Sequence, residues 1–214
     1  MAVSECDLLF SIGTRFNDRI TGKLHAFAPK AQIVHIDIDT ASISRNIHVD
    51  VPIVADALEA VIKMNEYVEP CETEEWMKQI KQWKEEHPLT MKNRAQMGPK
   101  DIIDEMNRQF DDAIIVADVG QHQMFVAQYA EITEKKQLIM SGGLGTMGYG
   151  FPGAIGAKLG NPDKTVIAVS GDGGMQMNIQ EFATAVLEEL PLILCVFNNE
   201  YLGMVRQWQK LFYG

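Results

Sequence analysis

The 214-residue sequence has little of several features that define large classes of protein. Its three cysteines, Cys6, Cys71 and Cys195, have spacings that indicate neither a disulfide framework nor a zinc site. Positive charge is also scarce, with 19 Lys and Arg residues against 29 Asp and Glu residues and a formal net charge of −10. An acidic chain without a basic patch repels phosphate backbones and anionic membrane surfaces, so we expect no nucleic-acid or membrane partner.

We expect neither a targeting segment nor a membrane segment in this sequence. The first residues, MAVSECDLLF, carry acids where a signal peptide needs a basic region, and no apolar run approaches the roughly 18 residues of a membrane span. A soluble protein of the reducing cytoplasm is therefore expected. A strand-like run begins at Asp7 and the chain ends just after a helical pattern, so we also expect a fragment of a longer protein.

The first third of the chain contains three runs that favour parallel β-strands, because each is rich in branched apolar residues and closes with Gly or Asp. These runs are residues 7–13, 32–39 and 51–56. A helix is expected from Ala57 to Tyr67 with Asp56 as its N-cap, followed by a charged amphipathic helix with Trp76 and Trp83 on one face. The polar stretch 87–97 indicates a linker, and the predicted domain boundaries are 1–70, 71–98 and 99–214.

The remainder alternates between strand and helix. The expected strands are 113–118, 137–142, 165–172 and 192–199, and the expected helices are 99–110, 123–132, 152–159, 179–189 and 204–213. Apolar strands without alternation are buried on both faces, and successive βα units require right-handed crossovers. The fold class is therefore predicted as α/β, with a doubly wound parallel sheet.

Small polar residues end the last two of these strands, where ligands of such sheets gather. Asp172 and Asn199 can lie at the same edge if their strands are neighbours, and their oxygens suit Mg²⁺. Gly171, Gly173 and Gly174 would let the backbone approach a phosphate. The simpler alternative is that Asp172 caps a turn and the Asn pair turns the chain.

The other loops allow more than one interpretation. Gly143, Gly145 and Gly148 have the GxGxxG spacing of a nicotinamide-binding fold, and Asp172 could then be its ribose-binding acid. In the first loop, Gly120, Gln121 and His122 could bind phosphate, although a lone His is more often solvated. Three features have structural explanations: Asn178 and Glu181 resemble a capping box, and Met147 and Trp208 fit core packing.

Charged residues near the expected strand ends of the first third could bind a phosphate-rich ligand or could form solvated loops. Arg15 and Arg19 flank an Asn-Asp pair just after the first strand. Asp37 and Asp39 close the second strand, where a carboxylate can accept hydrogen bonds from a ribose diol or can cap a turn.

Taken together, GDGG followed by NN resembles the thiamine-diphosphate motif of the pyruvate decarboxylase and transketolase superfamily. With RFNDRITGKL, IVHIDID, DVGQHQMF, SGGLGTMGYGFPGAIGA and NNEYLGMVRQWQKLFY, the chain is similar to the catalytic large subunits of acetolactate synthases. The resemblance runs from Asp7 to Tyr213. It implies part of a Rossmann-like, FAD-binding middle domain in 1–70 and a truncated thiamine-diphosphate domain in 99–214.

The resemblance also implies roles for particular residues. The implied Mg²⁺ ligands are Asp172, Asn199 and the carbonyl of Tyr201. The implied thiamine-diphosphate contacts are Gly120, Gln121, His122, Gly145, Met147, Asp172, Gly173, Gly174, Asn199, Tyr201 and Gly203, with Met147 supporting the bent conformation of the cofactor. The implied FAD contacts are Arg15, Asp37, Ile38 and Asp56, and the substrate-channel residues are Arg19 and Trp208.

The implied reaction condenses two pyruvates, or pyruvate and 2-ketobutyrate, to 2-acetolactate or 2-aceto-2-hydroxybutyrate with loss of CO₂, in branched-chain amino-acid biosynthesis. The family's glutamate-bearing domain is not found, so no catalytic residue is assigned and the fragment alone is expected to be inactive. A homodimer or tetramer and a regulatory small subunit are implied for the full-length protein. The alternatives are another thiamine-diphosphate carboligase, a non-catalytic cofactor-binding module and a nicotinamide-dependent oxidoreductase.

Overall fold

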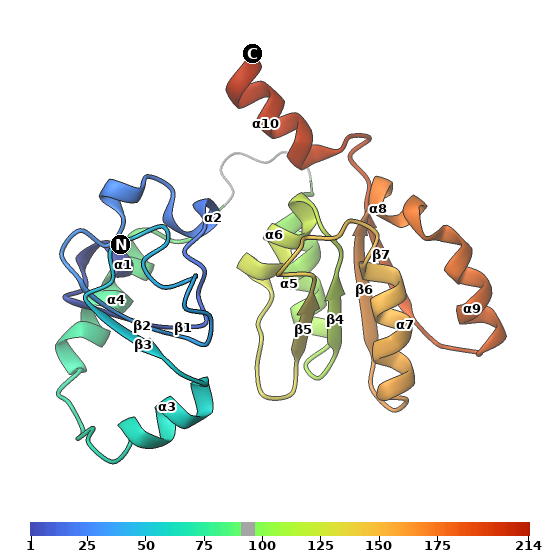
Figure 1. The fold of residues 1–214 in the computed structure, drawn as a ribbon. Helices are drawn as coiled ribbons and strands as arrows, with labels where there is room; N and C mark the ends of the chain where they lie inside the picture. Colours follow the sequence, from blue (N-terminus) through green and yellow to red (C-terminus); the bar gives the residue numbers. More distant parts are fainter. Residues whose placement is uncertain (91–96) are drawn as a thin grey trace. The chain divides into compact units, whose positions relative to one another are not determined.

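A computed structural model describes residues 1–90 and 97–214, with only the backbone of Arg19. The chain forms two compact units, Met1–Pro88 and Leu89–Gly214 (Figure 1). The charged helix that the sequence analysis places in a linker lies within the first unit.

The first unit contains a three-stranded parallel sheet of order β1-β2-β3. Its elements are α1 (Ala2–Glu5), β1 (Leu8–Ile12), α2 (Asp18–Thr21), η1 (Leu24–Ala26), β2 (Gln32–Asp37), β3 (Val51–Val54), α3 (Ala57–Met64) and α4 (Glu74–Glu86). All three predicted strands are confirmed. Asp56 caps α3 as expected, because its Oδ1 accepts hydrogen bonds from the N–H groups of Leu58 and Glu59.

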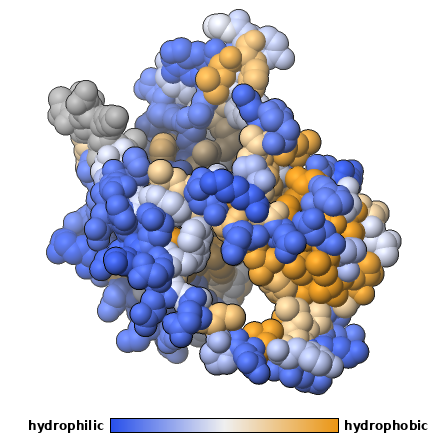
Figure 2. Space-filling view, turned by 90° about the vertical axis from the view of Figure 1, so that its left-hand side faces the viewer, coloured by the Kyte–Doolittle hydropathy of each residue, from blue (hydrophilic) through white to orange (hydrophobic). Residues whose placement is uncertain are grey.

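Strand β1 presents different side chains on its two faces. Leu8, Phe10 and Ile12 are exposed, whereas Ser11, on the other face, is buried. That second face carries a small core around Phe16, Ile33 and Val49. In Figure 2, many hydrophobic side chains on the viewed side lie in one area next to a broad hydrophilic area, and smaller hydrophobic areas lie apart from it.

The second unit contains a four-stranded parallel sheet of order β5-β4-β6-β7. Its elements are α5 (Pro99–Gln109), β4 (Ile114–Ala117), α6 (Gln121–Tyr129), β5 (Gln137–Met140), α7 (Gly150–Gly160), β6 (Val166–Gly171), α8 (Asp172–Met177), η2 (Ile179–Glu181), α9 (Phe182–Leu187), β7 (Ile193–Phe197) and α10 (Gly203–Tyr213). The four predicted strands are confirmed, and so is the predicted parallel sheet.

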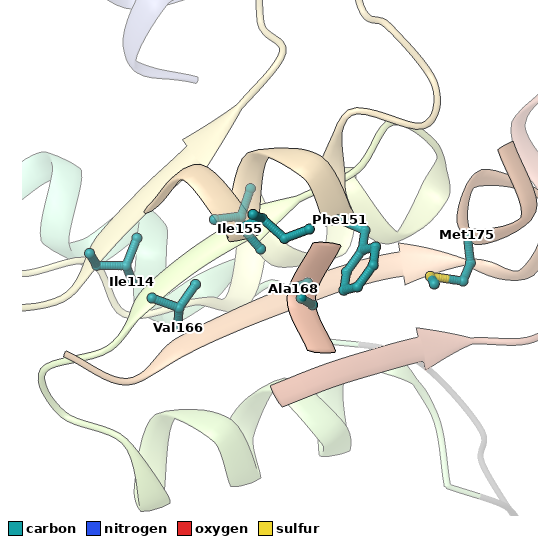
Figure 3. Packing of buried hydrophobic residues seen from close by; sticks show 9 residues of the cluster. Ile114, Phe151, Ile155, Val166, Ala168 and Met175 are labelled. Carbon is teal, nitrogen blue, oxygen red and sulfur yellow. The ribbon is translucent and has the colours of Figure 1, made fainter. Parts of the chain in front are cut away.

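Both faces of this sheet are covered, as the unbroken apolar strands predict. On one face, Phe151 and Ile155 of α7 pack with Ile114 and Val166, as Figure 3 shows. On the other face, helices α5 and α6 pack against alternate residues of β4 and β6. Every residue of β4 and β6 is buried, so these two strands form the centre of the unit.

The structure differs from the sequence expectations at residues 172–177 and at Trp208. Residues 172–177 form a helical turn rather than only a glycine-flanked loop, because tertiary packing around Gly174 and Met175 overrides the low helix propensity of glycine. Trp208 does not pack in a core: it is 39% exposed on α10, where its ring stacks on Phe212 with the centroids 5.0 Å apart.

Candidate functional site

The carboxyl edge of the four-stranded sheet gathers the predicted ligand-binding loops. Strand β4 lies between β5 and β6, so the chain leaves β4 for one neighbour and later returns on its other side. Helix α6, after β4, covers one face of the sheet, and α8, after β6, joins the core on the opposite face. The space beyond β4 and β6 is therefore a topological switch point, where α/β sheets bind ligands.

A buried carboxylate, Asp118, lies at this switch point with only 1% of its surface exposed. Its Oδ1 accepts hydrogen bonds from the N–H groups of Val119 at 2.6 Å and Gly148 at 2.8 Å. Its Oδ2 accepts a hydrogen bond from the Ser170 hydroxyl at 2.8 Å. One side chain thus joins the ends of β4 and β6 to the loop after β5, and its charge is compensated by three donors.

Two glycines allow the backbone to approach Asp118 closely. A Cβ atom on Gly150 would lie 2.6 Å from the Asp118 Cβ and 2.9 Å from its backbone nitrogen. A Cβ atom on Gly174 would overlap the Asp118 Oδ2. Glycine at these positions is therefore explained by packing around the carboxylate, before any ligand is considered.

His122 is buried beside the same strand ends. A Cβ atom on Gly120 or Gly171 would come within 2.6 Å or 3.0 Å of its ring, so the two glycines make room for the imidazole. Burial lowers the pKa of His122, and the charges of Asp118 and Asp172 partly oppose that shift. Its Nε2 has no hydrogen-bond partner among the described residues, which leaves a buried polar atom for a ligand to satisfy.

Asp172 and Asn199 follow neighbouring strands, which confirms the predicted adjacency of β6 and β7. The register pairs Gly171 with Phe197, so both chains leave the sheet at the same level. Asp172 is half-buried at the start of α8, and Asn199 is exposed with its Oδ1 accepting the N–H of Tyr201 at 3.1 Å. The pair combines a carboxylate with an amide, and the backbone carbonyls of the loop after β7 add further oxygens, which makes a hard oxygen set.

The start of α10 is held against the start of α6. The Gln121 side-chain amide donates to the Oε1 of Gln207 at 3.0 Å. A Cβ atom on Gly203 would overlap the Gln121 Oε1 and lie 2.9 Å from the Asn199 Nδ2. The loop after β7 is thus packed against the loop after β4, so residues from both loops are available to one ligand.

Met147 reaches the same region from the loop after β5. Its methyl group lies 3.1 Å from the position of a Cβ atom on Gly173, and the Leu202 side chain lies 2.8 Å from that position. Gly145, two residues earlier, has a φ of 65°. An apolar pair, Met147 and Leu202, therefore overlies the backbone of Gly173.

The capping box predicted for Asn178 and Glu181 is wrong. Asn178 precedes the short helix η2, but its side chain makes no capping hydrogen bond there. Its Nδ2 instead donates to the carbonyl oxygen of Gly148 at 2.7 Å. With the Nδ2 of Asn178 on Gly148, its Oδ1 accepts a hydrogen bond from the Gln180 side chain rather than from a backbone N–H of the helix.

In the first unit, four predicted ligand contacts lie along the carboxyl edge of its parallel sheet. Arg15 follows β1, Asp37 and Ile38 lie at the end of β2, and Asp56 follows β3. The Asp37 Oδ2 is 3.7 Å from the Nε2 of the fully buried His35. Asp56 already has a structural role as the cap of α3.

The two predicted substrate-channel residues belong to different units. The backbone of Arg19 lies in α2, and its side chain is outside the described part of the structure. Trp208 lies on α10.

Sequence reasoning missed Asp118 and Ser170. Their signal was present, because Asp118 directly follows the apolar run AIIVA and Ser170 directly follows the apolar run VIAV. A polar residue at the end of a fully buried strand needs a partner. That partner lies 52 positions away, too far for local pattern rules to identify.

No group of three or more His, Cys, Asp and Glu side chains in 1–90 and 97–214 is arranged to hold a metal ion. The predicted Mg²⁺ site has a different set of ligands, namely one carboxylate, one amide and one backbone carbonyl. Within those same ranges, no helix is both long enough and apolar enough to cross a membrane.

Two protein families match the chain. Residues 1–64 match the family described as "Thiamine pyrophosphate enzyme, central domain", and residues 118–214 match "Thiamine pyrophosphate enzyme, C-terminal TPP binding domain". The second match contains the loops that follow β4, β5, β6 and β7. The boundary regions between the two matches include α4 and α5.

Curated relatives are similar over essentially the whole chain. It is 45% identical over 220 residues to "Acetolactate synthase large subunit" of Porphyra purpurea, covering 100% of this chain and 37% of that protein. It is 44% identical over 231 residues to "Probable acetolactate synthase large subunit" of Methanococcus aeolicus, covering 99% and 39%. It is 42% identical over 223 residues to "Acetolactate synthase isozyme 3 large subunit" of Escherichia coli (strain K12), covering 100% and 39%. The chain thus spans less than two fifths of the length of these relatives, and their names do not favour the nicotinamide-dependent alternative.

Proposed function

This chain belongs to the thiamine pyrophosphate enzymes, and from that membership we propose that it forms part of the catalytic large subunit of an acetolactate synthase. The observation that carries the proposal is the meeting of Asp172 and Asn199 at one sheet edge, within a region matched to a cofactor-binding domain. The identity of 42% to 45% to named large subunits supports the choice among members of the family.

Thiamine diphosphate and Mg²⁺ are the proposed ligands of the four-stranded sheet. Asp172, Asn199 and the carbonyl of Tyr201 would hold Mg²⁺. Gly120, Gln121, His122, Gly173, Gly174 and Gly203 would surround the diphosphate, and Gly145 and Met147 would contact the thiamine rings. The orphaned Nε2 of buried His122 supports this fit, because a phosphate oxygen would satisfy it.

The cofactor, when bound, supplies the electron sink for breaking a bond beside a carbonyl. The chain's own residues bind and orient it. Asp172 and Asn199 would fix the charged end through the metal, and the apolar side chains of Met147 and Leu202, which lie over Gly173, would exclude water from its backbone. Excluding water in this way strengthens the electrostatic interactions in the site.

The proposed reaction is the condensation of two pyruvates, or of pyruvate and 2-ketobutyrate, with loss of CO₂, in branched-chain amino-acid biosynthesis. Arg19 and Trp208 are the proposed substrate-channel residues. No residue of this chain is assigned as the proton-transferring glutamate, so we expect residues 1–214 alone to bind cofactor without catalysing the condensation.

FAD is the proposed ligand of the first unit. Its contacts would be Arg15, Asp37, Ile38 and Asp56, which line the carboxyl edge of a parallel sheet, where dinucleotides bind. Assembly with further large subunits and with a regulatory small subunit is proposed for the full-length protein. The cysteines Cys6, Cys71 and Cys195 are free thiols, which suits the proposed cytoplasmic location.

Calorimetric titration of the 214-residue chain tests the cofactor proposal. We expect saturable binding of thiamine diphosphate that requires Mg²⁺, and no saturable binding of NAD. Asp172→Ala should abolish the Mg²⁺-dependent binding of thiamine diphosphate. The control is Asp163→Ala, which removes the same charge at an exposed position before β6 and should bind like the wild type. Binding of NAD without thiamine diphosphate, or equal effects of the two substitutions, would contradict the proposal.

A further inference from the structure

The peptide groups on either side of the Gly148 α-carbon are both held by side chains from other loops. The Gly148 N–H donates to the Asp118 Oδ1 at 2.8 Å, and the Gly148 carbonyl accepts from the Asn178 Nδ2 at 2.7 Å. Asp118 and Asn178 each lie 30 positions from Gly148. These contacts tie the loop after β5 to the end of β4 and to the segment after α8.

The two hydrogen bonds that hold Gly148, from its N–H to Asp118 and from Asn178 to its carbonyl, form a clamp on this residue. The conformation of Gly148 leaves the clamp little freedom. Its φ is 90°, a value that L-residues rarely adopt. A Cβ atom there would lie 2.9 Å from the Asn178 Nδ2 and 3.0 Å from the Met177 Cβ. Asn178 is oriented in turn, because its Oδ1 accepts a hydrogen bond from Gln180 at 3.2 Å, which leaves its amide N–H groups for Gly148.

Met147 is the residue directly before this clamp. The N–H held by Asp118 belongs to the peptide bond between Met147 and Gly148, so the hydrogen bond fixes the plane that ends the Met147 backbone. The Met147 methyl group lies over Gly173. The clamp therefore sets where the Met147 side chain begins, and packing over Gly173 sets where it ends.

We infer that Asn178 and Asp118 are positioning residues, which hold Gly148 so that Met147 supports the ring portion of thiamine diphosphate. This rests on the proposed function. Neither residue is assigned to the diphosphate or the metal, so their effect should be confined to recognition of the rings. Asn178 is the better probe of the two, since Asp118 also bonds Ser170 in the core.

Asn178→Asp tests the inference, because it preserves the shape of the side chain while removing the N–H donor to Gly148. Thiamine diphosphate and inorganic pyrophosphate, each with Mg²⁺, are titrated into the 214-residue chain. We expect the affinity for thiamine diphosphate to fall about tenfold, which corresponds to about 1.4 kcal/mol, while the affinity for pyrophosphate changes little. Equal losses for both ligands, or no loss for either, would overturn the inference.

Gln176→Glu is the matched control. It makes the same amide-to-carboxylate change at an exposed position of α8, two residues away, and should leave the ratio of the two affinities unchanged. Asn178→Ala removes the donor without adding charge, and it should reproduce the selective loss if Asn178→Asp does not fold. A comparable selective loss in Gln176→Glu would attribute the effect to charge and overturn the inference.

A double-mutant cycle tests whether Asn178 acts through Met147. In a Met147→Ala background, Asn178→Asp should cause little additional loss of affinity for thiamine diphosphate, whereas additive losses would overturn the inference. The same titrations test the proposed function. A wild-type chain that binds neither pyrophosphate nor thiamine diphosphate would contradict the proposed function and, with it, this inference. Binding of both ligands with additive losses would contradict this inference alone.

Discussion

The hydroxyl of Ser170 donates a hydrogen bond of 2.8 Å to the carboxylate of Asp118, although 52 positions separate the two residues. Both side chains are almost fully buried, at the adjoining ends of β4 and β6. The contact therefore lies at the switch point of the sheet, beneath the loops that carry the proposed cofactor contacts. A site built from several loops depends on such a contact for the fixed spacing of its parts.

Ser170→Ala should lower the free energy of unfolding by about 1–3 kcal/mol, because it leaves a buried carboxylate oxygen without its hydroxyl donor. Urea denaturation measures this loss. The matched control is Ser11→Ala in the first unit, where the buried hydroxyl has no hydrogen-bond partner among the described residues. Its removal should be neutral or stabilising, so an equal loss at both positions would contradict the role assigned to Ser170.

Gly150→Ala should destabilise the second unit by about 1–3 kcal/mol or more, because the new Cβ would meet the backbone of Asp118, which cannot rotate away. The control is Gly156→Ala in the same helix. There a Cβ atom meets nothing within 4 Å, and replacing a helical glycine by alanine should stabilise by up to about 1 kcal/mol. Thermal or urea unfolding should therefore show changes of opposite sign, and changes of the same sign would contradict the packing argument.

His122 should make the chain less stable in acid. Its pKa is lowered by burial from about 6.5, so the unfolded state binds the proton more readily than the folded state. The free energy of unfolding is then unaffected well above pH 6.5, falls as the pH drops through that value, and stops falling below the folded pKa. Urea unfolding between pH 8 and pH 5 in EDTA should show a steeper loss for the wild type than for His122→Gln; parallel curves would rule out this titration.

Cys195 and Cys71 should differ in reactivity. Burial raises the pKa of the Cys195 thiol, which reduces the thiolate available at neutral pH, whereas Cys71 is exposed. Iodoacetamide should therefore modify Cys71 before Cys195, as followed by mass spectrometry of tryptic peptides. Equal rates in urea would show that the difference arises from the fold, whereas equal rates under native conditions would contradict the burial of the Cys195 thiol.

The sheet and its edge could be predicted from the sequence because their signals are local. Strands β4 and β6 are unbroken apolar runs, and βα alternation between them admits essentially one handedness of connection. That Asp172 and Asn199 follow neighbouring strands could be expected only conditionally, because consecutive strands are often but not always neighbours in a sheet. The N-cap at Asp56 was equally local, since the side chain bonds its own helix.

The interior of the site could not be predicted because it depends on contacts between distant residues. Asn178 has a local capping role available, but its Nδ2 donates to the Gly148 carbonyl and its Oδ1 accepts from Gln180, so no backbone N–H of the helix is capped. The turn of α8 contains two glycines, and its helical form depends on packing around Asp118 rather than on propensity. Trp208 has core-like spacing with its neighbours, but no residue of α10 in the described chain is buried.

The position of β4 between β5 and β6 determines the order in which this unit can be completed during translation. Strand β4 is synthesised before β5, so these two strands can pair before β6, which follows only after α7. Until then Asp118 lacks the Ser170 donor, and its carboxylate remains hydrated on an incomplete sheet edge. The desolvation of one carboxylate is therefore a late step in the folding of the nascent chain.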